Sequence, residues 1–129
     1  MYSIRRAGMM FAAVFAVAAT ACADNSQDIK TCIMYPEDVK AAIAACTRLI
    51  DDPPVMDTTR HGWFAARGNH KRLAGDQKGA MADFNESIRL MPNDPQLYET
   101  RAELHAELGH ADKADADSKK AERLRAKKR

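Results

Sequence analysis

Histidine and cysteine are the side chains of this 129-residue sequence with the chemistry to bind a metal ion or attack a substrate. The histidines are His61, His70, His105 and His110. No two of them are three or four residues apart, the spacing that places two imidazoles on one helix face, and neither HExxH nor CxxC occurs. The serine-nucleophile motif GxSxG and the phosphate-binding loop are also missing. The sequence therefore predicts no catalytic activity, no metal site and no cofactor.

The cysteines point to a disulfide. Cys22 lies near the end of an apolar N-terminal stretch, which leaves Cys32 and Cys46 as a pair. A bridge between them closes a loop of about 15 residues and, by the chain-entropy account, stabilises the fold by roughly 3 kcal/mol. The alternative is a pair of reduced thiols in the core.

The first 23 residues are typical of a secretory signal peptide. Arg5 and Arg6 precede an apolar stretch over 7–21, and Ala21-Cys22-Ala23 supplies small residues for cleavage. We therefore expect the mature chain to begin at Asp24 and to be exported, to the periplasm in a bacterium. The apolar stretch is shorter than the roughly 18–20 residues that cross a bilayer, so no membrane-spanning segment is expected.

A second interpretation of the same segment changes the predicted location. The run Ala19-Thr20-Ala21-Cys22 resembles a bacterial lipobox, whose cysteine is acylated and becomes the N-terminus. It departs from that pattern at Ala19, where leucine is usual. In this alternative the protein is a lipoprotein anchored through Cys22.

Charge is unevenly distributed along the chain. Without residues 1–23 the chain holds 18 basic and 18 acidic residues, yet 118–129 hold seven basic residues and one acidic residue. The basic end is interpreted first as the solvated end of a helix, where cations favour the helix dipole. The alternatives are attraction to anionic lipid or envelope polymer, or docking onto an acidic groove of a second copy. No aromatic residues are interleaved with these cations, so nucleic acid is not an expected partner.

An internal repeat with a period of 34 residues relates 61–94 to 95–128. Seven residues are identical between the two units, and aromatic Phe64 superposes on aromatic Tyr98. The identities are Arg67 with Arg101, Gly75 with Gly109, Ala80 with Ala114, Ala82 with Ala116, Asp83 with Asp117, Arg89 with Arg123 and Leu90 with Leu124. A partial earlier unit matches at an offset of 38.

These units resemble the tetratricopeptide repeat, a helix-turn-helix unit with small and bulky residues at fixed places. The first unit matches that pattern at Phe64, Gly68, Ala80, Phe84 and Pro92, and the second at Tyr98, Ala102, Ala114 and Ala121. It departs at Lys71 and His105, where tyrosine is usual, at Ser87 (alanine), at Ser118 (phenylalanine) and at Ala126 (proline). The second unit is therefore degenerate, as terminal repeats are.

The resemblance implies an all-α fold, a right-handed solenoid of about two and a half repeats. The expected helices cover 26–33, 36–50, 58–74, 77–91, 95–108 and 111–127. Pro36 and Pro95 suit first helical turns, and Gly75 and Gly109 suit the tight turns between paired helices. The expected units are a signal peptide (1–23), a partial repeat with the disulfide and a loop (24–57), a repeat (58–94) and a repeat with a basic capping tail (95–129). Because solenoids generally need about three repeats, the disulfide is interpreted as a staple that compensates for the missing one.

Two sets of structural residues follow from the repeat. Close approach of paired helices is expected where Gly68 faces Ala80 and where Ala102 faces Ala114. Ion pairs between helices are expected for Arg67 with Asp83 and for Arg101 with Asp117, a structural role because the pair recurs with the period.

The function implied by the resemblance is protein binding. In this family the first helix of each pair lines a concave groove that holds extended peptides or partner helices. The groove-lining residues would be Asn69, Arg72, Gln96, Glu99, Glu103 and Glu107. Their acidic character suggests a partner with a basic segment, although an ordinary solvated helix face is the alternative. The alternative function is an envelope-tethered or self-associating structural protein, attached through the basic tail or a lipidated Cys22.

Overall fold

The computed structural model describes residues 25–34, 37–52 and 56–128, and these form six α-helices with no strand among them. The helices are α1 (Ser26–Ile33), α2 (Val39–Asp51), α3 (Asp57–Leu73), α4 (Gln77–Leu90), α5 (Pro95–Glu107) and α6 (Ala111–Lys127). The predicted all-α fold is confirmed. The predicted signal peptide, including Cys22, lies outside the described residues.

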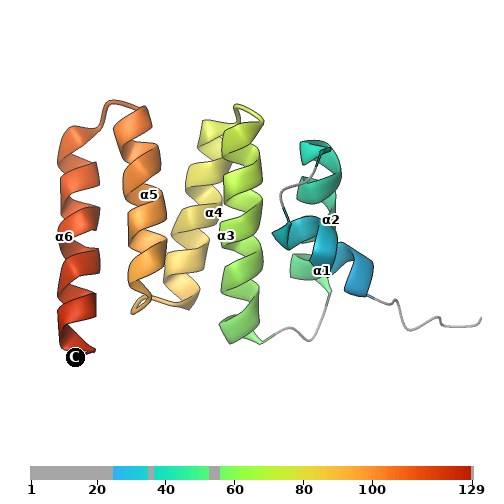
Figure 1. Cartoon of the computed structure of the whole chain (residues 1–129), viewed down its shortest axis with the longest axis horizontal. Coiled ribbons are helices and arrows are strands. Elements are labelled where there is room, and N and C mark those ends of the chain that lie inside the picture. Colours follow the sequence, from blue (N-terminus) through green and yellow to red (C-terminus); the bar gives the residue numbers. More distant parts are fainter. Residues whose placement is uncertain (1–24, 35–36, 53–55, 129) are drawn as a thin grey trace, which may run out of the picture.

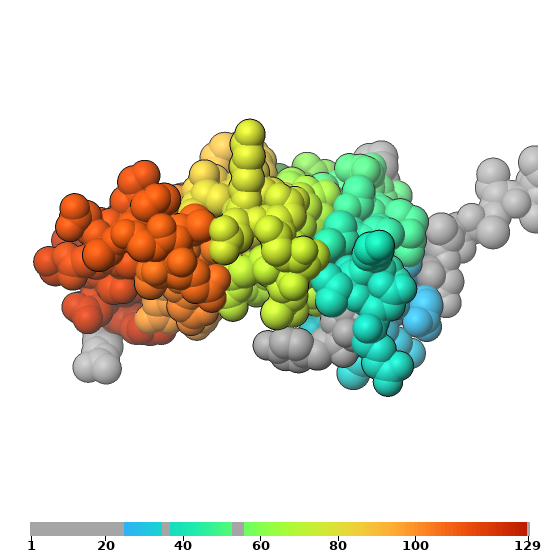
Figure 2. Space-filling model, turned by 90° about the horizontal axis from the view of Figure 1, so that it is seen from above, coloured from blue at the N-terminus to red at the C-terminus, as the bar shows by residue number. Residues whose placement is uncertain are grey.

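The helices form three pairs that follow one another along the long axis of the molecule, and the second and third pairs are antiparallel (Figure 1). Seen from above, the pairs appear as successive blocks in sequence order (Figure 2). The first pair is irregular, because α1 has only eight residues and runs across α2 instead of parallel to it (Figure 1). None of the described helices is both long and apolar enough to span a bilayer.

Aspartate caps fix where three of the helices begin. The Asp38 carboxylate accepts hydrogen bonds from the backbone N–H of Lys40 and Ala41, at 2.9 and 3.2 Å. Helix α2 therefore starts at Val39, three residues later than predicted, because a capping residue lies just outside the helix. Asp76 and Asp94 cap α4 and α5 in the same way, and Pro95 occupies the first turn of α5 as predicted.

The tight turns inside the second and third pairs depend on glycine. Gly75 and Gly109 have φ angles of 83° and 75°, a left-handed conformation in which a Cβ atom would be strained. This confirms the prediction that the turn lies at the same place in both repeats.

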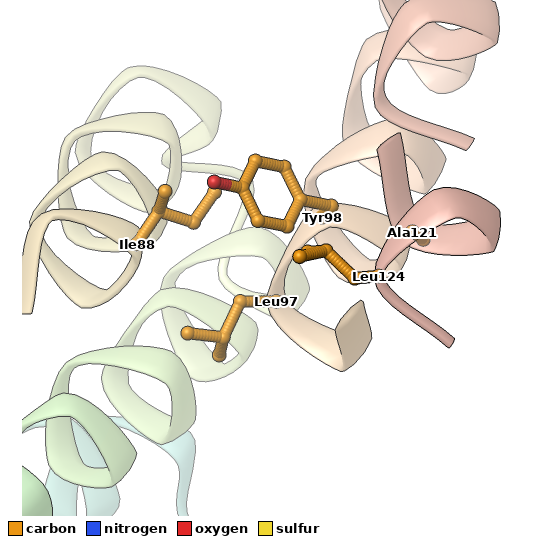
Figure 3. Close-up of a cluster of buried hydrophobic side chains, with 5 residues drawn as sticks. All are labelled: Ile88, Leu97, Tyr98, Ala121 and Leu124. Carbon is orange, nitrogen blue, oxygen red and sulfur yellow. The ribbon is translucent and has the colours of Figure 1, made fainter. Parts of the chain in front are cut away.

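The core consists of separate clusters between neighbouring helices. One joins α4, α5 and α6: the ring of Tyr98 lies between Ile88 and Leu124 (Figure 3), and its hydroxyl donates a hydrogen bond to the carbonyl oxygen of Pro92 at 2.9 Å. A second, of Ala80, Phe84 and Leu104, connects α4 to α5.

The third cluster contains the disulfide. Cys32 and Cys46 are bridged and fully buried, which confirms the predicted pair and covalently links α1 to α2. Ala45 and Leu49 complete the cluster, and Trp63 of α3 packs against it. The short α1 is therefore held both to its partner helix and to the next pair.

Candidate functional site

The candidate site is the face formed by α3 and α5, the first helices of the second and third pairs. Arg72 on α3 reaches across to α5, where its Nη1 lies 3.1 Å from Glu103 Oε2 and 3.5 Å from Glu107 Oε1. Both carboxylates remain accessible, since the side chains of Glu103 and Glu107 are 64% and 49% exposed. One guanidinium thus balances only one of two exposed acids, and a net negative charge stays on this part of the surface.

The other predicted groove residues differ in their surroundings. Glu99 forms a bidentate ion pair with Arg125 of α6, so its charge is neutralised within the chain. Gln96 is exposed at the start of α5. Asn69 lies on α3 one helical turn before Arg72, and its side chain has no hydrogen-bond partner among the described residues. The structure therefore brings Arg72, Glu103 and Glu107 together but leaves Glu99 in a separate pair.

The predicted structural pairs form one arrangement that occurs twice. Arg67 donates from Nε and Nη2 to the two carboxylate oxygens of Asp83, at 2.9 and 2.8 Å. Arg101 donates in the same way to Asp117, at 2.8 and 2.7 Å. Such two-pronged contacts are the strong form of the ion pair, and the hydrogen bond from Arg101 to Asp117 raises the pKa of that arginine.

Each arginine also contacts the preceding helix pair, through a partner that was not predicted from the sequence. Nη1 of Arg67 donates to Thr47 Oγ1 of α2 at 3.1 Å, and Nη1 of Arg101 donates to Asn85 Oδ1 of α4 at 2.9 Å. Thr47 and Asn85 are 38 residues apart, the offset at which the partial first unit matches the second. A search for side-chain acceptors at that offset would have found them. We call each arginine with its aspartate and this third partner a clasp.

The predicted small-residue contacts are also placed by the structure. A Cβ atom on Gly68 would lie 2.6 Å from Cε1 of Phe84 and 3.3 Å from the carbonyl oxygen of Ala80. Glycine is therefore required where α3 crosses α4. Ala102 and Ala114 line a common surface hollow of α5 and α6 together with Ser118, which occupies the position of Phe84 one repeat later.

The side chains of this site suit the binding of polypeptide. Carboxylates, a guanidinium and a primary amide form ion pairs and hydrogen bonds with side chains and main chain. Among the described residues, no three histidine, cysteine, aspartate or glutamate side chains lie close enough to hold a metal ion.

Comparison with known proteins finds no matching family model. A 60-residue segment, 46% of this chain, is 37% identical to part of the Hsp70-Hsp90 organizing protein 2 of Arabidopsis thaliana and spans 10% of that protein. The crystal structure of MamA superposes with a TM-score of 0.63 over 71% of this chain and 52% of that one, at 23% identity. The second likeness shows the fold alone. The chain thus spans a tenth of the curated relative and about half of the solved structure.

Proposed function

We propose that this chain, which has a tetratricopeptide-repeat fold, is a non-catalytic protein–protein interaction module. Its groove, formed by α3 and α5, would hold an extended segment of another polypeptide. The observation that carries the proposal is the meeting of Arg72 with Glu103 and Glu107, two exposed carboxylates and one guanidinium from successive repeats. The surplus negative charge suits a partner with a basic segment.

Rigidity of the groove supports this function. Each clasp fixes a first helix to its own second helix and to the preceding pair, so the groove-lining side chains are presented on a fixed frame. A preorganised surface loses little conformational entropy on binding, and the partner segment alone must become ordered.

The test is selection of randomised extended peptides on the full chain, followed by measurement of each Kd by fluorescence anisotropy. We expect enrichment of peptides with lysine or arginine. The double variant Glu103→Lys with Glu107→Lys should weaken their binding at least about ten-fold, because two attractive contacts become repulsive.

The matched control is Asp112→Lys with Glu122→Lys, which makes the same change of charge at exposed positions of α6. This variant should bind as the unaltered chain does. Failure to enrich any peptide, or equal weakening in both double variants, would contradict binding in the groove.

We further propose that the protein is exported to the cell envelope, in a periplasmic form or with an acylated Cys22. The supporting observations are the sequence of residues 1–23 and the Cys32–Cys46 bridge, which suits an oxidising compartment. Mass spectrometry of the product from a bacterial envelope fraction would distinguish a chain that begins at Asp24 from one with a lipidated Cys22. A full-length chain recovered only from the cytosol would contradict export.

The basic C-terminal segment gives the weaker alternative, attachment of a structural protein to an anionic surface. Its charge is partly used within the chain, because Arg125 pairs with Glu99 and Lys119 pairs with Asp115 at 2.6 Å. Replacement of the exposed cations Arg123, Lys127 and Lys128 by glutamine should therefore leave peptide binding in the groove intact, and it spares Ala121, Leu124 and Arg125, which the fold uses. Binding that disappears with these three cations and with added salt would favour the alternative.

A further inference from the structure

A small apolar hollow lies where the end of α1 meets α3. Its volume is about 150 Å³, and its walls include Ile33 and Met34 at the end of α1 and Ala66, Asn69 and Leu73 on α3. Asn69 lies one helical turn before Arg72 on α3, so the hollow adjoins the part of the α3 surface that carries Arg72.

Large apolar side chains surround this hollow without being buried by it. Ile33, Met34 and Leu73 are 61%, 66% and 59% exposed, and among the described residues one further large apolar side chain, Met56, is comparably exposed, at 71%. Met56 does not line the hollow. A cluster of exposed apolar side chains around a cavity is typical of a binding surface, whereas a single exposed one needs no explanation.

The hollow is held in shape from both sides. The disulfide fixes Cys32 at the end of α1 to α2, and the Nε2 atom of His70 on α3 lies 2.7 Å from the carbonyl oxygen of Cys32. That carbonyl is an acceptor, so His70 donates through Nε2. An eight-residue helix is marginal by itself, and the position of Ile33 and Met34 therefore depends on the bridge.

The chemistry next to the hollow selects its occupant. A cavity of about 150 Å³ admits a group as large as a benzene ring, so one leucine, methionine or phenylalanine side chain fits. Asn69, at the wall, has an amide with no hydrogen-bond partner among the described residues, and Arg72, one helical turn further along α3, contacts the exposed acids Glu103 and Glu107. An apolar side chain alone would not be drawn toward these carboxylates, whereas an adjoining basic residue would be.

We propose that this hollow anchors one large apolar side chain of a partner polypeptide whose adjoining residues are basic and extend toward Glu103 and Glu107. The inference rests on the proposed function and specifies the partner's chemistry: an extended bipartite segment, apolar then basic. It also makes the apolar half of recognition dependent on the Cys32–Cys46 bridge.

The experiment uses a set of synthetic Gly/Ser peptides in which one leucine is separated by one to five residues from a Lys-Arg pair, in both chain directions. Binding to the full chain is measured by fluorescence anisotropy. At the best spacing, we expect the leucine peptide to bind at least about ten-fold tighter than its Leu→Ser counterpart, from burial of one large apolar side chain.

Variants assign this advantage to the hollow. Leu73→Gln should remove it, and Met56→Gln, which changes an equally exposed apolar residue elsewhere, should keep it. Dithiothreitol should remove the leucine advantage while both peptides keep their charge-dependent binding. Glu103→Lys with Glu107→Lys should weaken the leucine and serine peptides equally.

The outcomes separate this inference from the proposed function. Equal binding of leucine and serine peptides at every spacing, with binding still lost on charge reversal, overturns the anchor and supports the groove. No binding of any basic peptide counts against both. Dimerisation abolished by Leu73→Gln would assign the hollow to a second copy, and peptide binding that strengthens when residues 1–24 are removed would assign it to the chain's own N-terminal segment; either result overturns the inference.

Discussion

The pairs α3–α4 and α5–α6 have nearly the same clasp but different surroundings. In α3–α4, Asp83 accepts from Arg67 and also pairs with Lys71 Nζ at 2.9 Å, and its side chain is 5% exposed. In α5–α6, Asp117 pairs with Arg101, and His105 stands where Lys71 is one repeat earlier. Phe84 is 2% exposed and packs against Leu104 of the next pair, whereas its counterpart Ser118 is exposed.

The difference shows that the 34-residue repeat determines the backbone and the clasp. The position of a pair in the stack determines which residues surround the clasp and which cover the outer face of the pair. A face covered by a following pair needs a large apolar residue and full compensation of buried charge. A face that no described helix covers needs neither. Changes at equivalent positions of the two pairs can therefore be compared to measure the effect of a covering helix pair on stability.

Removal of the large aromatic residue should give the greatest contrast. Phe84→Ala should lower the free energy of unfolding by about 3–5 kcal/mol, because it leaves a cavity between α3, α4 and α5. Ser118→Ala should change it by less than about 0.5 kcal/mol. Urea unfolding followed by circular dichroism measures both. Similar losses in the two variants would mean that Ser118 is as well covered as Phe84.

Removal of the clasp aspartates should come next. Asp83→Ala leaves both Arg67 and Lys71 without their shared partner in a buried site, and we expect a loss of about 3 kcal/mol. Asp117→Ala leaves one cation that is more accessible to water, with an expected loss of about 1–2 kcal/mol. Thermal unfolding of the two variants at pH 7 tests the order. The reverse order would contradict the role assigned to Lys71.

Exchange of the small residues Gly68 and Ala102 should lower the free energy of unfolding less than the changes above. One variant adds a methyl group and the other removes one. Gly68→Ala should destabilise the fold by about 1–2 kcal/mol, because the added methyl group meets the fixed ring of Phe84. Ala102→Gly should cost about 1 kcal/mol through helix propensity alone. In a Phe84→Ala background the cost of Gly68→Ala should disappear, as measured by a double-mutant cycle.

The smallest expected effect concerns pH. Burial lowers the pKa of His105 below its ordinary 6.5, with Asp117 opposing this shift and Arg101, Lys113 and His110 adding to it. Below pH 6.5 the unfolded chain therefore binds a proton more readily than the folded chain, so the free energy of unfolding falls as the pH is lowered from 7.5 to 5.5.

The variant His105→Lys isolates this contribution. Lysine stays protonated throughout that range in both states and should pair with Asp117 as Lys71 pairs with Asp83. The loss of stability on acidification should be smaller than in the unaltered chain, by less than about 1 kcal/mol. Parallel pH profiles of the melting temperature would exclude His105 as a contributor.

Much of this fold follows from the sequence because the determining features are periodic. The 34-residue repeat predicted the helix pairs, the glycine turns and the partners Arg67 with Asp83 and Arg101 with Asp117. The helix boundaries agree to within a residue or two, except at Val39, where the cap Asp38 was not recognised.

The candidate site was less predictable because it depends on contacts that do not recur with the 34-residue repeat. Glu99 pairs with Arg125, which is 26 residues away on another helix, and no spacing rule connects them. The hollow arises because α1 is short and runs across α2, an orientation that periodicity does not specify. The family resemblance assigned Arg72, Glu103 and Glu107 to the groove but did not predict their mutual contacts.

The clasp has a consequence for adding repeats to this chain. Its arginine and aspartate lie within one 34-residue block, and the same block supplies, through an asparagine, the acceptor for the block that follows. A tandem copy of residues 61–94 inserted after Asp94 would thus contain its own arginine–aspartate pair. It would also present an asparagine side-chain oxygen to the arginine of the repeat that follows. Lengthening this protein by gene duplication would therefore preserve the clasp, whereas at the new junction His70 of the copy would take the place of Leu104 against Phe84.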